Sequence, residues 1–290
     1  MAPVNTGVIA AVVSSALGGT AAALTRYTIH ASDPVTLAAF RFGIGSIPIV
    51  AIALALGVKW PKGRDWLWVT LLGALFFSVF FVIYNVAMSY TTAARGSLAL
   101  SMLPLTTMLV AALMGREALG RRKSLGVLIA VGGVALALSA GLRNAPPEAW
   151  RGDLVMAAAT LCMALYNVWS RPLMQRSSMM GFLATGMGAG ALLSVAIAWY
   201  SSGFEKALGN FGAPQWWAVA FLGLFGGAAA FYLWVFALER TTPTRVANTM
   251  TVNPVAASLV AAVIIGEPVG IELAVGIAAV GAGIWIAAKT

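Results

Sequence analysis

The sequence predicts an all-α integral membrane protein of ten transmembrane helices, arranged as two inverted five-helix repeats around a central cavity. Hydrophobic residues make up 60% of the 290 positions and charged residues only 9%, so the chain carries more apolar surface than a soluble domain could bury. Apolar segments of about 20 residues recur, which is the length a helix needs to cross a ~30 Å hydrocarbon core. Residues 91–133 also return as residues 241–283, which indicates a duplication.

The repeat is specific because several matches fall on uncommon residue types. Twelve of the 43 ungapped positions are identical, where this composition would give roughly four by chance. The matches in the first copy are Thr91, Thr92, Arg95, Pro104, Leu109, Val110, Ala111, Ala112, Glu117, Gly120, Gly126 and Gly133. Each copy therefore begins with a Thr-Thr-x-x-Arg motif.

The ten spans follow from the apolar segments and the polar breaks between them. They are expected at residues 6–28, 34–57, 66–89, 92–114, 120–141, 152–172, 179–201, 214–238, 243–265 and 269–288. Asp33-Pro34 marks the start of the second span, because Asp caps a helix and Pro suits its first position. The N-terminal segment lacks a basic leader, so we expect a retained first helix rather than a signal peptide.

The longest linker contains Pro146-Pro147, which cannot continue a helix. We therefore expect one five-helix unit at residues 1–145 and a second at residues 146–290. Twelve of the 18 Lys and Arg residues fall on one side of the predicted membrane and six on the other, which places both termini in the cytoplasm. Because five is an odd number, the second unit enters the membrane from the opposite side, as in secondary transporters that work by alternating access.

The marks of each half resemble those of the EamA-type members of the drug/metabolite transporter superfamily. They include the Pro of the fourth span, the Leu-Val-Ala-Ala run, Gly115-Arg116-Glu117, Gly266-Glu267-Pro268 and the pair Arg41-Phe42. The chain is most similar to the bacterial exporters of aromatic amino acids. The resemblance implies a carrier of the inner membrane that exports amino acids, aromatic or hydrophobic, and related small metabolites. A drug-efflux carrier of the same fold is the alternative.

The substrate cavity is expected from polar and aromatic residues inside the spans. An uncharged cavity of rings, amides and hydroxyls suits an amphipathic or zwitterionic solute with an apolar side chain. The expected cavity residues are Phe81, Tyr84, Asn85, Met88, Ser97, Ser101, Tyr166, Asn167, Trp169, Phe231, Trp234, Asn248 and Asn253. The aromatic stripe of the third span also fits the packed core or the lipid-facing surface. Of the first and sixth spans, only the sixth is expected to be polar.

Charged residues and prolines supply further candidates. Arg41 lies inside the second span and either binds a substrate carboxylate, snorkels to the outer interface or caps a neighbouring helix. Pro104 and Pro254 are expected to bend the fourth and ninth spans near mid-membrane, as hinges or as static kinks. Glu117 and Glu267 are interpreted as structural charges at the start of the following helix.

Arg95 and Arg245 begin helices, where a positive charge opposes the helix dipole, so each is expected to have a tertiary partner.

Several classes of function are disfavoured. The basic residues form no stripe with interleaved aromatics, so we expect no nucleic-acid partner. The sequence has no phosphate-binding loop for an ATPase, no metal motif, and neither a G-x-S-x-G motif nor an intramembrane aspartate pair. We expect no cofactor and no enzymatic activity; an intramembrane enzyme or a non-transporting scaffold is the alternative of another class. The acidic residues lie at helix ends or in loops, so export is expected to be independent of protons.

Overall fold

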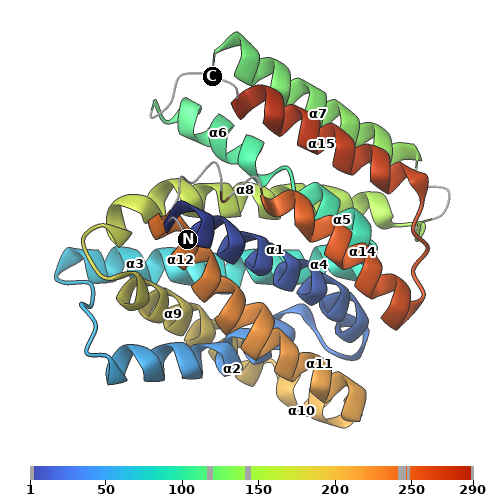
Figure 1. The fold of residues 1–290 in the computed structure, drawn as a ribbon. Coiled ribbons are helices and arrows are strands. Elements are labelled where there is room, and N and C mark those ends of the chain that lie inside the picture. The colour runs from blue at the N-terminus through green and yellow to red at the C-terminus, as the bar shows by residue number, and fades with distance from the viewer. Residues whose placement is uncertain (1–2, 116–119, 141–144, 241–245, 247–248, 289–290) are drawn as a thin grey trace.

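The computed structural model describes residues 3–115, 120–140, 145–240, 246 and 249–288, and these residues form helices joined by short turns (Figure 1). The first half contains α1 (Pro3–Thr28), η1 (Ile29–Ala31), α2 (Pro34–Ala55), α3 (Arg64–Ala74), η2 (Leu75–Phe80), α4 (Phe81–Tyr90), α5 (Ala93–Leu100), α6 (Leu103–Leu113) and α7 (Arg121–Ala140). The second half contains α8 (Ala149–Met174), α9 (Met179–Tyr200), α10 (Gly203–Asn210), α11 (Ala213–Gly223), η4 (Leu224–Ala229), α12 (Ala230–Arg240), η5 (Thr249–Thr251), α14 (Val252–Ile265) and α15 (Ile271–Ala288).

Seven helical segments within the described residues are long and apolar enough to cross a membrane. They are Thr6–Ala31, Pro34–Ala55, Arg64–Tyr90, Ala93–Leu113, Ala149–Met174, Met179–Tyr200 and Ala213–Arg240. Three shorter apolar helices, Ser124–Leu138, Thr249–Ile265 and Ile271–Ala282, coincide with the other expected spans. The helices fall where the sequence predicts them, and the count of ten crossings stays a prediction. The short helix α10 was not expected.

The expected cap at the start of α2 is present. The Asp33 carboxylate accepts hydrogen bonds from the backbone N–H groups of Val35 and Thr36, both at 3.0 Å, and Pro34 occupies the first helical position. Gly115 and Gly266 follow α6 and α14 with φ of 66°, a left-handed conformation that favours glycine at a helix C-terminus.

The break expected at each paired proline is also present. In the first half α5 ends at Leu100 and α6 begins at Leu103, so Pro104 lies in the first turn of the second segment. In the second half the 3₁₀ turn η5 precedes α14, and Pro254 again lies in the first turn. Proline suits this position because the first-turn N–H groups have no intrahelical acceptor.

Two equivalent helix crossings hold the halves together. A Cβ placed on Gly45 of α2 would lie 2.7 Å from the Gly223 carbonyl oxygen of α11, and one on Gly190 of α9 would lie 2.9 Å from the Gly73 oxygen of α3. Gly45 and Gly190 are 145 residues apart, and Gly73 and Gly223 are 150 apart. The second span of each half therefore crosses the third span of the other half at a glycine pair, where the backbones approach closely.

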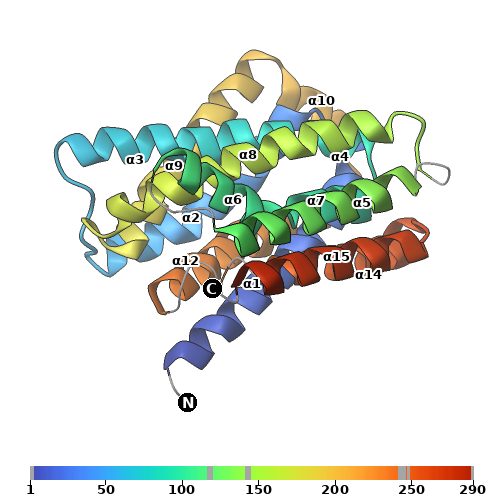
Figure 2. The same ribbon diagram turned by 90° about the horizontal axis from the view of Figure 1, so that it is seen from above.

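Each third span contains a π-helical segment directly after this crossing, η2 in the first half and η4 in the second. A π segment inserts an extra residue and rotates the helix that follows. The cavity-lining parts, α4 and α12, both begin where a π segment ends. The fifth helices, α7 and α15, lie side by side at one edge of the molecule (Figures 1 and 2).

Candidate substrate cavity

A small cavity of about 60 Å³ lies between the halves, at the level where α4 and α12 leave their π segments. Its lining combines rings, hydroxyls, one side-chain amide and one guanidinium. The lining residues are Ser14, Ser15, Gly18, Arg41, Phe80, Phe81, Tyr84, Leu100, Met163, Gly226, Ala230, Phe231, Trp234, Met250 and Asn253. Six of them were expected from the sequence: Arg41, Phe81, Tyr84, Phe231, Trp234 and Asn253.

Arg41 is the charged residue of this lining. Its side chain is only 5% exposed, and Nη2 donates to the Gly226 carbonyl oxygen in η4 at 2.7 Å. The guanidinium carbon also lies 4.6 Å from the ring centroid of Phe81, a cation–π distance. Arg41 therefore does not snorkel to the membrane interface, because the crossing of α2 and η4 holds it inside the protein.

Two donors of Arg41 remain unused. Nε and Nη1 are buried and have no hydrogen-bond partner within the part of the chain that the structure describes. A buried guanidinium is stabilised when an acceptor satisfies its remaining N–H groups. The Asn253 Oδ1 atom, also in the lining, is a buried acceptor without a partner among these residues. The cavity thus presents polar atoms that a ligand can satisfy.

The first helix is more polar toward the cavity than expected. Ser14 donates from Oγ to the Ala230 carbonyl oxygen at 2.7 Å, and the hydroxyls of Ser15 and Thr249 lie 2.9 Å apart. The expectation that the first span contributes no polar lining is therefore wrong. The adjacent serines in a small-residue helix were the available signal, but hydroxyls in such a helix often bond their own backbone.

The aromatic stripe of the third span lies partly in the packed core and partly at the cavity. Phe76 and Phe77 are buried in the core, and Tyr166 of α8 stacks on Phe76 with ring centroids 4.1 Å apart. Phe80, Phe81 and Tyr84 face the cavity instead. The packed-core interpretation thus holds for the first part of the stripe, and Tyr166 is a core residue rather than a lining one.

Several other expected residues lie outside the lining. Asn85 is buried, and its Nδ2 donates to the Pro34 carbonyl oxygen at 2.8 Å. Met88 is buried against Gly96, where a Cβ would lie 2.7 Å from the Met88 methyl carbon. Ser101 donates to the Leu98 carbonyl oxygen at 2.7 Å. Ser101 bonds to its own helix, whereas Asn85 and Met88 contact neighbouring helices, and the sequence pattern reveals none of these partners.

The remaining expected residues also lie outside the cavity lining or outside the described part of the chain. Ser97 is buried in α5, and Asn167 donates to the Thr107 hydroxyl at 3.5 Å. Trp169 is 38% exposed on α8 and is not among the lining residues of this cavity. A helical period of 3.6 places Trp169 about 60° off Tyr166, turned toward the surface. Asn248, Glu117 and Arg245 lie outside the described residues.

Glu267 has a different partner from the one expected. Its carboxylate accepts from the backbone N–H of Ala93 at 3.0 Å, at the start of α5, and lies 3.4 Å from Nε of Arg26. Glu267 thus stabilises the N-terminus of a helix in the other half rather than that of α15, which follows it. Arg95 has the tertiary partner expected of it, since its Nη2 lies 2.5 Å from the Asp153 carboxylate.

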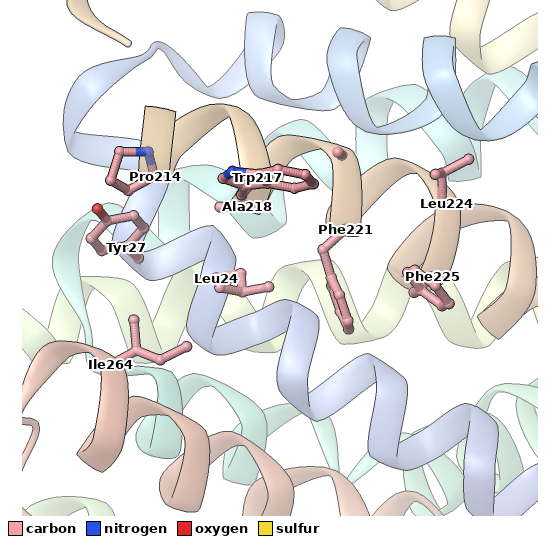
Figure 3. Close-up of a pocket in the computed structure, with 10 residues that line it drawn as sticks. Leu24, Tyr27, Pro214, Trp217, Ala218, Phe221, Leu224, Phe225 and Ile264 are labelled. Carbon is pink, nitrogen blue, oxygen red and sulfur yellow. The ribbon is translucent and has the colours of Figure 1, made fainter. Parts of the chain in front are cut away.

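A larger crevice of about 590 Å³ lies away from this cavity, between α1 and α11 (Figure 3). Its lining is almost wholly apolar and includes Leu24, Tyr27, Trp217, Phe221 and Ile264. Trp217 is 78% exposed, as expected for a ring that faces lipid. The crevice offers no charged group to a solute, so the smaller central cavity is the better candidate for substrate.

Comparison with known proteins agrees with the repeat and with the fold. The family described as "EamA-like transporter family" matches residues 5–139 and again residues 150–288. One solved crystal structure superposes with a TM-score of 0.70 over 98% of this chain and 96% of that chain, at 24% identity. This likeness shows the same fold.

Several curated relatives are described as transporters. An uncharacterized transporter of Archaeoglobus fulgidus is 23% identical over 93% of this chain and 94% of its own length. The uncharacterized transporter YyaM of Bacillus subtilis is 22% identical over 87% and 84%, respectively. A probable terminal-alkyne amino-acid exporter of Streptantibioticus cattleyicolor is 26% identical over 78% and 74%. The chain is a multi-pass membrane protein with two copies of the family's domain, and it belongs to the EamA-like transporter family.

Proposed function

We propose that the protein is a secondary transporter that exports amino acids with aromatic or hydrophobic side chains, and related small metabolites, across the bacterial inner membrane. The observation that carries the proposal is Arg41, a buried guanidinium with two unused donors in a cavity lined by rings. A substrate carboxylate would satisfy these donors, and Phe81, Phe231 and Trp234 would pack against the apolar side chain. The similar amino-acid exporter supports the same substrate class.

The transport cycle follows from the repeats. We propose that each half crosses the membrane five times, so that the halves are inverted and both termini are cytoplasmic. The equivalent crossings at Gly45–Gly223 and Gly190–Gly73 support this, because each half offers the other the same contact. The cavity of about 60 Å³ is far smaller than the roughly 300–1,000 Å³ of ligand pockets. Substrate entry therefore requires one half to move against the other, with Pro104 and Pro254 as the proposed hinges.

The test is efflux of phenylalanine from vesicles that contain the purified protein, compared with phenethylamine, which lacks the carboxylate. Replacement of Arg41 by Gln should lower phenylalanine flux at least tenfold, since loss of a charge-assisted hydrogen bond costs about 1.5–3 kcal/mol. Phenethylamine flux should be unchanged. Arg151→Gln is the matched control, because Arg151 is half-exposed in a surface ion pair.

An imposed pH gradient completes this experiment. No accumulation of phenylalanine is expected from the gradient alone, since we propose that transport follows the substrate gradient. Equal phenylalanine flux in wild type and Arg41→Gln would contradict the carboxylate site. Phenylalanine and phenethylamine fluxes of similar size, both insensitive to Arg41→Gln, would instead favour a drug-efflux carrier, which the ring-rich lining also suits.

A further inference from the structure

The turn that joins α4 to α5, residues Thr91–Arg95, is held by a carboxylate from the other half. The Thr91 hydroxyl donates to Oδ1 of Asp153 in α8 at 3.0 Å, and Arg95 Nη2 lies 2.5 Å from Oδ2 of the same side chain. One carboxylate thus binds both ends of the turn. These two residues belong to the Thr-Thr-x-x-Arg motif of the repeat.

A second carboxylate from the other half binds the middle of the same turn. Glu267 accepts from the backbone N–H of Ala93 through Oε2 at 3.0 Å, and its Oε1 lies 3.4 Å from Arg26 of α1. Arg26 in turn donates to the carbonyl oxygens of Met88 and Ser89 at 2.9 and 3.0 Å, at the end of α4. Two second-half carboxylates therefore tie α1, α4 and α5 together at one end of the molecule.

These contacts are shielded from water. The side chains of Arg95, Asp153, Arg26 and Glu267 are 10–14% exposed, so removal of one partner leaves a poorly solvated charge. The ion pair between Arg176 and Asp65, which also joins the halves, has an arginine that is 58% exposed. Exposed pairs contribute little, so the described pairs at the Thr91–Arg95 turn are the stronger tie.

The tied turn lies over the cavity. Leu100, at the end of α5, lines the cavity, and the helix rises about 1.5 Å per residue toward the turn. Ser97 lies between them, about one helical turn from Leu100, and is buried. The cavity-lining Leu100 and the Thr91–Arg95 turn thus lie at opposite ends of the short helix α5, with Ser97 between them.

The repeat does not reproduce this tie. The family matches begin at residues 5 and 150, so Asp153 aligns with Val8 in the first half. Valine carries no carboxylate, so the sequence does not repeat this acidic residue. The sequence therefore places an additional carboxylate at one end of the carrier.

We propose that Asp153 and Glu267 close this end of the cavity by clamping the Thr91–Arg95 turn, and that the carrier at rest is closed here because its other end lacks the counterpart of Asp153. The inference rests on the proposed transport function. It assigns the rest state of the carrier, which the transport proposal leaves open.

Site-specific thiol labelling tests the clamp. Cys162 is the only cysteine in the sequence, so Cys162→Ala gives a background without thiols, and Ser97→Cys places a reporter just behind the clamp. Vesicles of both orientations are treated with a membrane-impermeant maleimide. Slow labelling is expected in the parent, and at least tenfold faster labelling in Asp153→Ala and in Glu267→Ala, from the Arg26 side only.

Two controls separate opening from unfolding. Asp65→Ala breaks the exposed pair and should leave the labelling rate unchanged. A reporter at Ser78, which is buried and hydrogen-bonded to Ser194 at 2.8 Å, should stay unlabelled in the clamp variants. If Ser78→Cys becomes labelled in the Asp153→Ala variant, that variant is unfolded. The Glu267→Ala variant then tests the clamp by itself, since Glu267 contacts the turn through different atoms.

Parent-like labelling of Ser97→Cys in the folded clamp variants, or fast labelling of the parent from the Arg26 side, would overturn the proposal. Labelling is independent of flux. Faster labelling in the clamp variants, together with no substrate flux in the wild-type protein, would support the clamp and contradict the transport function.

Discussion

At the scale of single residues, Arg41 marks a helix crossing at which the two halves carry side chains of different size. The position that aligns with Arg41 at an offset of 145 is Gly186, and the position that aligns with Gly226 at an offset of 150 is Phe76. One crossing has its bulky side chain on the second span, and the other has it on the third. The sequence predicted Arg41 as a candidate, but its partner is a backbone carbonyl 185 residues away, which no local pattern reveals.

Gly226→Ala tests this packing. A Cβ at Gly226 would lie 2.8 Å from the Ala21 Cβ, so α1 and η4 must separate there, and 3.4 Å from Arg41 Nη2, whose bond to the Gly226 carbonyl the movement of η4 would disturb. We expect a loss of about 1–3 kcal/mol in unfolding free energy and a higher KM for phenylalanine. Thermal unfolding and vesicle flux measure the two effects. Gly132→Ala is the control, because a Cβ there meets no atom within 4 Å. Wild-type KM in Gly226→Ala would show that Arg41 is not positioned by this contact.

At the scale of elements, the boundaries were largely predictable and the irregularities were not. Asp33, Pro34, Pro104 and Pro254 act through their own backbone neighbours, so the sequence predicted a helix start and two breaks correctly. The π segments η2 and η4 and the helix α10 went unpredicted. A π insertion depends on what packs against the helix, and hydropathy alone gives the same expectation for α and π segments.

The two glycine crossings should be equally intolerant of a side chain. Gly45→Ala and Gly73→Ala would bring a Cβ to 2.7 Å from the Gly223 oxygen and 2.2 Å from the Gly186 Cα, so backbone must move against backbone. Each should cost about 1–3 kcal/mol or more in thermal unfolding. Gly43→Ala, on the same helix, meets only the Val195 side chain at 3.6 Å and should be neutral. Equal melting temperatures for Gly43→Ala and Gly45→Ala would refute close packing at this crossing.

At the scale of the whole molecule, the duplication accounts for the arrangement of the helices, and the residues that differ between the two copies account for the cavity. The repeat predicted a helix break near each paired proline, and both halves contain it because the proline stands at the same position in each copy. The cavity depends on residues that differ between the halves, such as Arg41 against Gly186. The two ends also differ, since Asp153 has only Val8 as its counterpart. A protein built from equivalent units can therefore favour one closed end over the other.

This difference between the ends leads to a pH dependence with a definite sign. Burial raises the pKa of Glu267 above its ordinary 4.5, and the N–H of Ala93 and the charge of Arg26 only partly oppose that effect. In the proposed open state we expect the carboxyl to be exposed, with a pKa near its ordinary value. The closed state therefore binds the Glu267 proton more tightly than the open state does. Protonation of Glu267 stabilises the closed state at low pH, and this stabilisation is lost as the pH rises through the raised pKa.

Acidification on the Arg26 side should thus favour closure, although it breaks an ion pair, because the neutral carboxyl no longer costs desolvation. Labelling of Ser97→Cys should slow as pH falls toward 4.5. Maleimide also reacts more slowly in acid, since less thiolate is present. The rate is therefore divided by that of the same reporter in Glu267→Gln, which shares the thiol chemistry and cannot titrate at 267. A ratio that rises on acidification would mean that the ion pair with Arg26 outweighs burial and that the charged form of Glu267 holds the clamp.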